Sequence, residues 1–376
     1  MENKLKVAHI ISSSNIGGSP KHTLLLCEEI NALGSETLII YPGHGSYAEQ
    51  FCNSSVRTIS LDKMSLSFTS YRQIKKILIN ENVDLIHCHE LKSDFIGYCV
   101  GKSLHIPVVT TIHNMISKSR LNSLKRYIYC RISSWLYNHM SRILAVSETV
   151  KEITMRDLKV PEGLITVIPN GTRIIDKTSL PSKNSILESF KLSPNHPVIV
   201  MVGRMIPKQK GYEYFVESLP EIVEAISDIQ VLIVGDGTIK SELEEKVKGL
   251  GITEKCLFTG WVSDPTPLIY ASDVVVIPSL WDPLPRTLLE SMMVGTPVIG
   301  TKVDGIKEVI EDHETGILIP PGNSAAIATA VIGLLTHPDL HKKISVNAEK
   351  LAREKYSSIR HAVDTMMIYK KVLNQE

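Results

Sequence analysis

The 376-residue sequence lacks the features of membrane, fibrous and nucleic-acid-binding proteins. No run of about 18 consecutive apolar residues is present, which excludes a bilayer-spanning helix. Lys and Arg number 41 against 40 Asp and Glu, so the chain is not a nucleic-acid-binding polycation. Neither a low-complexity tract nor a repeat of about 20–50 residues is visible, which excludes a solenoid and a disordered protein.

Cysteine is scarce, and no two cysteines show the spacing of a zinc or redox motif. The N-terminal segment also lacks the long hydrophobic core of a signal peptide, because its apolar run ends at Ile11. We therefore expect free thiols and a soluble cytoplasmic protein, at most peripheral at the inner face of a membrane. The six cysteines are Cys27, Cys52, Cys88, Cys99, Cys130 and Cys256.

Charge is distributed unevenly along the chain. Residues 1–175 carry 20 Lys and Arg against 14 Asp and Glu, a net charge of +6, and the later residues carry 21 against 26, a net charge of −5. This asymmetry indicates that the first half meets something anionic. The content of 43% apolar and 22% charged residues is ordinary for globular proteins, and the length fits two domains of roughly 100–200 residues.

Short runs rich in Val and Ile alternate with longer amphipathic stretches. Such strands, each followed by a helix, are typical of parallel sheets covered on both faces. The strands expected in the first half are Leu5–Ile11, Glu36–Tyr41, Val56–Leu61, Val83–Cys88, Pro107–Ile112, Arg142–Val146 and Leu164–Ile168. Those expected in the second half are Pro197–Val202, Gln230–Val234, Cys256–Thr259, Asp273–Ile277, Pro297–Gly300 and Gly316–Ile319. The sequence therefore predicts an α/β protein of two Rossmann-like domains that face each other across a cleft.

The expected domain boundary lies at the turn-forming segment 169–173. The polar, proline-containing stretch that follows, up to Pro197, is typical of an interdomain linker. We therefore assign residues 1–172 to the first domain and residues 173–376 to the second. The last helix, about 356–376, either stays with the second domain or packs back on the first.

Ligands of open parallel sheets bind beyond the carboxyl ends of the strands, so the loops there carry the candidate sites. The first such loop contains Gly17 and Gly18, before a helix expected to begin near Pro20. Paired glycines let backbone amides approach an anionic ligand at the helix start. A tight turn that merely needs a positive φ is an equally good interpretation. The loop does not match the G-x-G-x-x-G fingerprint, which disfavours a dehydrogenase.

The second loop follows the first strand of the second domain and contains Gly203, Arg204 and Lys210. Arg binds a phosphate through two parallel hydrogen bonds, and Lys supplies a point charge. Because cations at a helix start oppose the helix dipole, an anionic ligand would explain their presence. The alternative is a solvated basic turn, and we expect Lys208 to point to water.

The third loop, 278–290, combines two prolines with Asp282 and Glu290. The prolines stiffen the loop and fit the first turn of a helix expected near Arg286. Free backbone amides from Arg286 to Leu288 are suited to holding a phosphate. The two carboxylates are suited to accepting hydrogen bonds from hydroxyl groups. Alternatively, Asp282 caps the helix and Glu290 faces solvent.

Together these segments resemble the retaining family-4 glycosyltransferases of the GT-B fold, over nearly the whole chain. Each fragment is modest, but their order and spacing are highly specific. In the second half the matching segments are Gly203-Arg204, Lys210-Gly211, Pro278-Ser279, Glu290, Gly295-Thr296-Pro297-Val298-Ile299 and Gly316-Ile317-Leu318-Ile319-Pro320-Pro321-Gly322. In the first half they are Gly17-Gly18, Thr111-Ile112-His113, Ala145-Val146-Ser147-Glu148 and Ile168-Pro169-Asn170-Gly171.

The resemblance implies transfer of a sugar from a nucleotide-sugar donor, with retained anomeric configuration and no essential metal or other cofactor. It makes residues 1–172 the acceptor-side domain and residues 173–376 the nucleotide-sugar-binding domain, with the active site in the cleft between them. Without a metal, negative charge that develops on the leaving diphosphate must meet fixed cations and helix amides. The implied catalytic residues are Arg204, Lys210, Asp282, Glu290 and His113, and the implied donor-binding residues are Gly17, Gly18, Gly203, Val262, Leu284, Arg286, Thr287 and Leu288.

The resemblance also implies individual roles. Arg204 and Lys210 would neutralise the diphosphate, and Glu290 would hold the ribose hydroxyls. Backbone around Val262 would receive the base. Gly17 and Gly18 would close over the phosphate and the sugar, and His113 would contact the sugar.

The third loop departs from the family pattern at two positions. The family's usual pair is two glutamates separated by seven residues, whereas here the first is Asp282, one methylene shorter. The usual glycine before the final glutamate is replaced by Pro285, which has no N–H to donate. Arg286 beside it offers a compensating phosphate donor. These changes bear on the sugar more than on the nucleotide.

His87, His89 and His113 lie within or just after two of the expected strands. A lone histidine such as His113 is most often structural, but its place at the carboxyl end of a strand and the resemblance favour a sugar contact. His87 and His89 share a face by strand alternation, as metal ligands would. No third ligand is apparent, so we expect no metal there and a core position for Cys88.

The segment 118–142 carries six basic residues and no acidic one, with aromatic residues interleaved. Such a helix can lie on an anionic membrane or present a surface to a lipid-linked acceptor. The alternative is one solvated basic face with the aromatic residues packed inward. The aromatic residues are Tyr127, Tyr129, Trp135 and Tyr137.

The sequence thus predicts a metal-independent retaining glycosyltransferase. The family's habits favour a UDP-hexose or UDP-N-acetylhexosamine as donor and a glycan or lipid-linked precursor, of polysaccharide biosynthesis, as acceptor. A non-catalytic nucleotide- or glycan-binding relative is an alternative because Asp282 breaks the carboxylate pair, and a sugar-nucleotide epimerase is another. Intact Arg204, Lys210 and Glu290 favour transfer. No residue identifies the sugar, the linkage or the oligomeric state, and nucleic acid is not expected as a partner.

Overall fold

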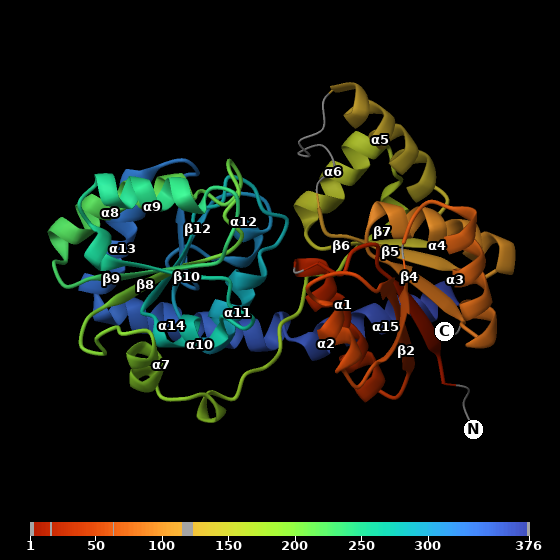
Figure 1. The fold of residues 1–376 in the computed structure, drawn as a ribbon, viewed down its shortest axis with the longest axis horizontal. Helices are drawn as coiled ribbons and strands as arrows, with labels where there is room; N and C mark the ends of the chain where they lie inside the picture. Colours follow the sequence, from red (N-terminus) through yellow and green to blue (C-terminus); the bar gives the residue numbers. More distant parts are fainter. Residues whose placement is uncertain (1–3, 16, 63, 115–122, 374–376) are drawn as a thin grey trace. The chain divides into compact units, whose positions relative to one another are not determined.

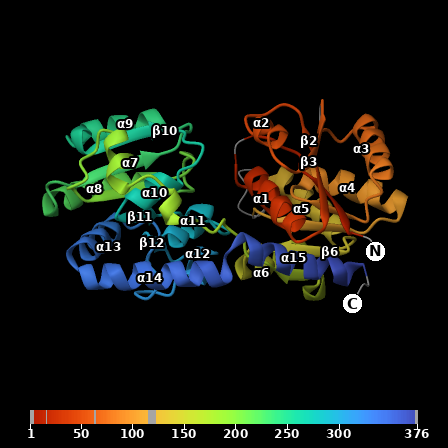
Figure 2. The same ribbon diagram turned by 90° about the horizontal axis from the view of Figure 1, so that it is seen from below.

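The computed structural model describes residues 4–15, 17–62, 64–114 and 123–373, and the chain divides into two compact units (Figure 1). Unit 1 comprises Met1–Gly171 and Ser358–Glu376, and unit 2 comprises Thr172–Ser357. Each unit contains one parallel sheet with helices on both of its faces (Figures 1 and 2). Among the described residues, no helix is both long enough and apolar enough to cross a bilayer.

The sheet of unit 1 has seven parallel strands in the order β3-β2-β1-β4-β5-β6-β7. Its strands are β1 (Lys6–Ile10), β2 (Glu36–Pro42), β3 (Arg57–Leu61), β4 (Leu85–Cys88), β5 (Val108–Ile112), β6 (Arg142–Ala145) and β7 (Ile165–Val167). Its helices are α1 (Gly18–Ala32), α2 (Ala48–Cys52), α3 (Phe68–Asn80), α4 (Leu91–Leu104), α5 (Ser123–Tyr137), α6 (Glu148–Leu158) and α15 (Ser358–Val372).

The last helix, α15, belongs to unit 1 and packs against α1 (Figure 2). Its Tyr369 is fully buried in a cluster with Val7, Leu26 and Leu85. The Tyr369 hydroxyl also lies 2.6 Å from Nδ1 of His87. The polypeptide therefore returns to the first sheet after completing unit 2.

The sheet of unit 2 has six parallel strands in the order β10-β9-β8-β11-β12-β13. Its strands are β8 (Val198–Val202), β9 (Gln230–Val234), β10 (Cys256–Gly260), β11 (Val274–Ile277), β12 (Val298–Thr301) and β13 (Ile317–Ile319). Its helices are α7 (Lys183–Ser189), α8 (Tyr212–Ala225), α9 (Lys240–Gly249), α10 (Thr266–Ala271), α11 (Arg286–Val294), α12 (Ile306–Val309), α13 (Ser324–Thr336) and α14 (Pro338–Lys355). Each of the thirteen strands expected from the sequence is present, with ends displaced by at most two residues.

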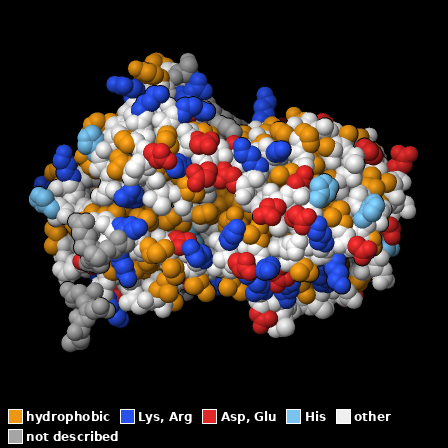
Figure 3. All heavy atoms as spheres, turned by 180° about the vertical axis from the view of Figure 1, so that it is seen from behind, with side chains coloured by type: hydrophobic (Ala, Val, Ile, Leu, Met, Phe, Trp, Pro, Cys, Tyr) orange, Lys and Arg blue, Asp and Glu red, His pale blue; other side chains and the backbone are white. Residues whose placement is uncertain are grey.

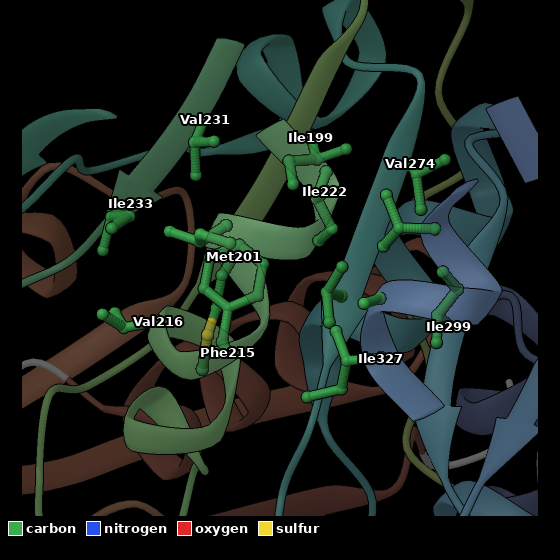
Figure 4. Packing of buried hydrophobic residues seen from close by; sticks show 14 of the residues in the cluster. Ile199, Met201, Phe215, Val216, Ile222, Val231, Ile233, Val274, Ile299 and Ile327 are labelled. Carbon is green, nitrogen blue, oxygen red and sulfur yellow. The ribbon is translucent and has the colours of Figure 1, made fainter. Parts of the chain in front are cut away.

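The core of unit 2 lies between its sheet and helices α8 and α13. Figure 4 shows Ile199 and Met201 of β8 beside Ile222 and Phe215 of α8, with Ile327 of α13 nearby. These five side chains are at most 2% exposed. Because every residue of β11 is also buried, the strand is a continuous apolar run, as a sheet covered on both faces requires.

The polar stretch before Pro197 is not a simple linker, and this expectation is wrong. It contains α7, which Ser182 caps by accepting the Ser185 N–H at 3.2 Å. Ile186 and Leu187 of α7 are buried, and the helix packs against α10. The segment therefore packs on unit 2 through the buried face of α7.

Each sheet reverses its strand order once, and the candidate site residues lie near these positions. In unit 1 the order reverses between β1 and β4, and in unit 2 between β8 and β11. The loops that leave the two strands at such a point diverge to opposite faces of the sheet and leave a crevice in which ligands bind. The predicted loop with Arg204 and Lys210 follows β8, and the predicted loop with Asp282 and Glu290 follows β11.

Candidate active site

Lys210 and Asp282 come from the two loops at the reversal point of unit 2 and form an ion pair. The Lys210 Nζ lies 2.5 Å from Oδ2 of Asp282. The Asp282 side chain is 7% exposed and that of Lys210 is 23% exposed. Since Pro285, and not Asp282, is the N-cap residue of α11, the interpretation of Asp282 as a helix cap is wrong.

Close backbone contact holds these two loops together. Gly211 has φ 75, and a Cβ there would lie 2.0 Å from the carbonyl oxygen of Pro278. Next to this contact, the Leu280 N–H donates to the Gln209 carbonyl at 2.7 Å. A side chain at Gly211 would therefore push the Lys210 loop away from the Asp282 loop.

Asp304, which was not among the residues predicted from the sequence, anchors Asp282 from the loop after β12. The Asp282 N–H donates to Oδ2 of Asp304 at 2.9 Å, and the Gly305 N–H donates to the Asp282 carbonyl at 3.2 Å. Asp304 is 8% exposed and follows β12. The rule that selected the other loops after strands applies to it as well, but an Asp-Gly pair is also a common turn.

Arg286 and Glu290 lie one turn apart on α11 and form a second ion pair. The Arg286 Nη2 lies 3.2 Å from Oε1 of Glu290, whose side chain is 8% exposed. The interpretation of Glu290 as a solvent-facing residue is therefore wrong. The Nη1 atom of Arg286 is buried and donates no hydrogen bond within the described chain. A buried guanidinium N–H of this kind is suited to a phosphate oxygen.

The start of α11 offers fewer backbone donors than expected. The Leu288 N–H donates to the Pro285 carbonyl at 3.2 Å, so it is not free for a ligand. The Leu288 side chain is fully buried in the core. The amides of Arg286 and Thr287 remain as the donors at the helix start.

The other predicted residues of unit 2 lie around these loops. Gly203 directly follows β8, and Arg204 after it is exposed. Leu284 is buried, and Val262, beyond the end of β10, is half-buried. Lys208 is exposed, which confirms the prediction that it points to water.

Gly17, Gly18 and His113 belong to unit 1. Gly17 has φ 176, an extended conformation, so the interpretation that this glycine serves a positive φ is wrong. His113 follows β5 and is half-buried, with its Nε2 atom 3.3 Å from Nδ1 of His89.

The expectation that no third ligand accompanies His87 and His89 is wrong. His9 of β1 is the direct partner of His87 across the parallel pair β1–β4. Nitrogen atoms of His9, His87 and His89 lie within 4.8 Å of one another, and so do those of a second group, His22, His89 and His113. Cys88 is fully buried, as expected. Sequence spacing did not show the cluster because its members are separated by up to about a hundred residues and meet only through strand pairing.

Comparisons with known proteins agree with this architecture. Residues 16–174 match the family model described as Glycosyltransferase Family 4, and residues 196–337 match the one described as Glycosyl transferases group 1. An uncharacterized glycosyltransferase of Methanocaldococcus jannaschii is 31% identical over 78% of this chain and 77% of its own length. The UDP-Gal:alpha-D-GlcNAc-diphosphoundecaprenol alpha-1,3-galactosyltransferase of Escherichia coli is 26% identical over 88% of this chain and 87% of its own.

Solved structures share the fold over the full length. A glycosyltransferase of Rickettsia africae has a TM-score of 0.84 and 24% identity, covering 100% of both chains. The Anabaena protein HepE, solved with UDP, has a TM-score of 0.85 and 19% identity, covering 98% of this chain and 100% of its own. The two Rossmann-like units with parallel sheets agree with these matches. The chain is therefore an enzyme that belongs to the family-4, group 1 glycosyltransferases of the GT-B fold.

Proposed function

We propose that this glycosyltransferase uses a nucleoside-diphosphate sugar, a UDP-hexose or UDP-N-acetylhexosamine, and transfers the sugar with retention of anomeric configuration and without a metal. The acceptor is a hydroxyl of a glycan or lipid-linked precursor. The relative from Escherichia coli named above acts, by its name, on a diphosphoundecaprenol-linked sugar with UDP-Gal, and HepE was solved with UDP. These names support the donor and acceptor classes proposed for this chain.

The observation that carries the proposal is the set of cations at the reversal point of unit 2. Lys210 is held by Asp282, and Arg286 is held by Glu290, with its Nη1 atom buried and without an acceptor among the described residues. Arg204 follows the neighbouring strand β8. A bound diphosphate would accept a hydrogen bond from Arg286 and pair with the ammonium group of Lys210. When the diphosphate leaves the sugar, these fixed cations would balance its negative charge.

The family resemblance supplies the remaining roles. We propose from it that Glu290 accepts hydrogen bonds from the ribose hydroxyls, and from the ion pair in the structure that Asp282 orients Lys210. On unit 1, His113 is proposed to contact the donor sugar, with Gly17 and Gly18 close to its phosphate. Leu284, Thr287 and the backbone near Val262 would complete donor binding.

Calorimetric binding of UDP, GDP, ADP, CDP and dTDP, each with and without EDTA, tests the donor site. One nucleotide should bind equally well with the chelator present. Lys210→Met and Arg286→Met should each weaken its binding roughly 10- to 100-fold, the value of a charge-assisted hydrogen bond. Lys208→Met, on the same loop but exposed, is the matched control and should bind like the parent. Binding that requires a divalent ion, or that survives both site substitutions, contradicts the proposal.

Retention without an evident protein nucleophile supports attack on the front face of the sugar. In that mechanism the acceptor hydroxyl attacks as the bond to the diphosphate breaks, and its proton passes to the departing phosphate oxygen. The anomeric configuration of the product, measured by NMR, should equal that of the donor. A stable covalent glycosyl-enzyme detected by mass spectrometry would overturn the front-face mechanism.

We also propose that α5 touches an anionic membrane surface. Lys118 and Arg120 lie outside the described residues, but α5 exposes a stripe of apolar side chains with basic residues beside it. In Figure 3 hydrophobic and basic side chains lie together where α5 projects from unit 1. Tyr137 is buried, as the inward-packed alternative requires, whereas Tyr127 and Trp135 are not. The exposed apolar residues are Leu124, Tyr127, Ile128, Ile132 and Trp135, and the exposed basic residues are Lys125, Arg126 and Arg131.

Sedimentation with vesicles tests this contact. The protein should bind vesicles that contain an anionic lipid, and binding should weaken as salt rises because the basic residues are screened. Ile128→Ser combined with Leu124→Ser should reduce binding, whereas Val346→Ser, an exposed apolar residue of unit 2, should not. No sedimentation at low salt contradicts the proposed membrane contact.

A further inference from the structure

Six histidine side chains gather in unit 1, near the point where its strand order reverses. His9 lies in β1 and His87 lies in β4. His89 comes just after β4, and His113 just after β5. His22 comes from α1 and His361 from α15. Each of these rings has its centroid within 5.8 Å of the centroid of at least one other ring of the group. The proposed transfer reaction uses His113 and none of the other five.

We propose that His22, His89 and His113 form a binding site for a divalent transition-metal ion, Zn²⁺ foremost, and that the bound ion inhibits sugar transfer. Ligand nitrogens of the three rings lie within 4.8 Å of one another. The inhibitory consequence, though not the site itself, rests on the proposed role of His113 in sugar binding.

The ring geometry fits three imidazoles around one point. With Zn–N bonds of about 2.0–2.1 Å, two nitrogens of a tetrahedral site lie about 3.4 Å apart and their ring centroids about 5 Å apart. Here Nδ1 of His89 lies 3.3 Å from Nε2 of His113. The three centroid distances are 4.6 Å for His22–His113, 5.6 Å for His89–His113 and 5.8 Å for His22–His89. Small rotations of the rings therefore bring three nitrogens to a common ion.

The second triad, His9, His87 and His89, is less suited to a metal. Both ring nitrogens of His87 are already bonded, Nδ1 to the Tyr369 hydroxyl at 2.6 Å and Nε2 to Oγ1 of Thr111 at 2.7 Å. His87 would have to break one of these buried hydrogen bonds to bind an ion. We therefore assign His87 a structural role, in line with its position in β4, between β1 and β5 in the sheet.

His9 acts instead as the partner that orients His89. Its Nδ1 lies 3.0 Å from Nε2 of His89. An ion on Nδ1 of His89 requires the ring proton on Nε2, and Nδ1 of His9 can accept a hydrogen bond from that N–H. Metal-ligating histidines usually donate a hydrogen bond from their second ring nitrogen in this way. The Nε2 atom of His9 is itself buried and makes no hydrogen bond within the described chain, so among the described residues this ring hydrogen-bonds to His89 alone.

The chemistry of the ligands favours a borderline metal. All three ligands are imidazoles, and a neutral imidazole binds a transition metal through the lone pair of a ring nitrogen. Three imidazoles without a carboxylate select Zn²⁺, Ni²⁺, Co²⁺ or Cu²⁺ over Mg²⁺ or Ca²⁺. His113 is half-buried, which leaves a fourth position on the ion open to solvent.

Calorimetric titration of the EDTA-treated full-length protein with Zn²⁺ tests the site in the absence of donor and acceptor. We expect about one strong site per chain, with Mg²⁺ giving no heat at the same concentration. His22→Gln and His113→Gln should each weaken Zn²⁺ binding by at least about 10-fold, since each removes a ligand. The control His44→Gln, at an exposed histidine of the same unit, should bind Zn²⁺ like the parent. Thermal midpoints of all variants establish that they are folded.

Two results would overturn the site: Zn²⁺ binding that is unchanged in both variants, or no Zn²⁺ binding to the parent protein. Should a variant fail to fold, X-ray absorption of the Zn²⁺-loaded parent decides the question, because it counts imidazole ligands directly. Three coordinated imidazoles support the site, and one or none refutes it. Because these measurements need no turnover, they remain informative if the proposed glycosyl transfer is wrong. Zn²⁺ that binds but does not slow transfer would refute the inhibitory role alone.

Discussion

The Lys210–Asp282 pair should be energetically coupled, and a double-mutant cycle measures that coupling. Lys210→Met keeps the length of the side chain but leaves the Asp282 carboxylate, 7% exposed, without its cation at 2.5 Å. Removing one partner of a fully buried pair costs about 3–5 kcal/mol. Lys210 is 23% exposed and partly screened by water, so we expect about 2–3 kcal/mol.

The converse substitution, Asp282→Asn, should cost less. The amide keeps the shape of the side chain, and the freed Lys210 can extend its ammonium group to water. The backbone of Asp282 also stays attached through Asp304 at 2.9 Å. We expect about 0.5–1.5 kcal/mol for this variant. The double variant should cost clearly less than the two single variants added together, because neither charge is then left alone.

Urea unfolding in a Trp135→Phe background gives the required free energies. The remaining tryptophans, Trp261 and Trp281, both lie in unit 2, so their fluorescence reports on the unit that holds the pair. Additive effects within about 0.5 kcal/mol, or a larger cost for Asp282→Asn than for Lys210→Met, would refute the electrostatic reasoning.

Three further predictions concern the backbone, the pH dependence and the last helix. Gly211→Ala should destabilise unit 2 by about 2 kcal/mol or more in urea unfolding, because residue 211 has φ 75 and its new Cβ would collide with the Pro278 carbonyl. The control Gly249→Ala, with open space around position 249, should not destabilise it. Equal effects of the two substitutions would contradict the role of this close contact. Burial raises the pKa of Asp94 to about 7, so the folded state loses stability as the pH rises from the unfolded value of 3.8 through 7. Asp94→Asn should therefore raise the thermal midpoint at pH 8, and this advantage should shrink as the pH falls to 6; a difference independent of pH would contradict the assignment. Tyr369→Phe should cost about 1–2 kcal/mol, since it leaves a buried nitrogen of His87 unpaired; an unchanged midpoint would show that this hydrogen bond is unimportant.

The local pattern of residues determined the secondary structure and the general place of the candidate site. Runs such as Val198–Val202 and Val274–Ile277 are short and rich in Val and Ile, and a longer amphipathic stretch follows most of these runs. Their length and composition were enough to predict all thirteen strands. The rule that ligands bind beyond strand ends then selected the loops of Lys210 and Asp282 without any structural information.

Tertiary structure alone decided which side chains meet. The ion pair of Lys210 with Asp282 joins residues 72 positions apart, and it exists because β8 and β11 are neighbours in the sheet. Burial of Glu290, the support of Asp282 by Asp304, and the return of α15 to unit 1 follow from the same long-range packing. The histidine cluster is the clearest example, because strand order brings His9 beside His87, and no spacing along the chain encodes that pairing. Periodicity reports on each residue's own element, whereas contacts between distant elements depend on the order and register of strands, which local sequence does not specify.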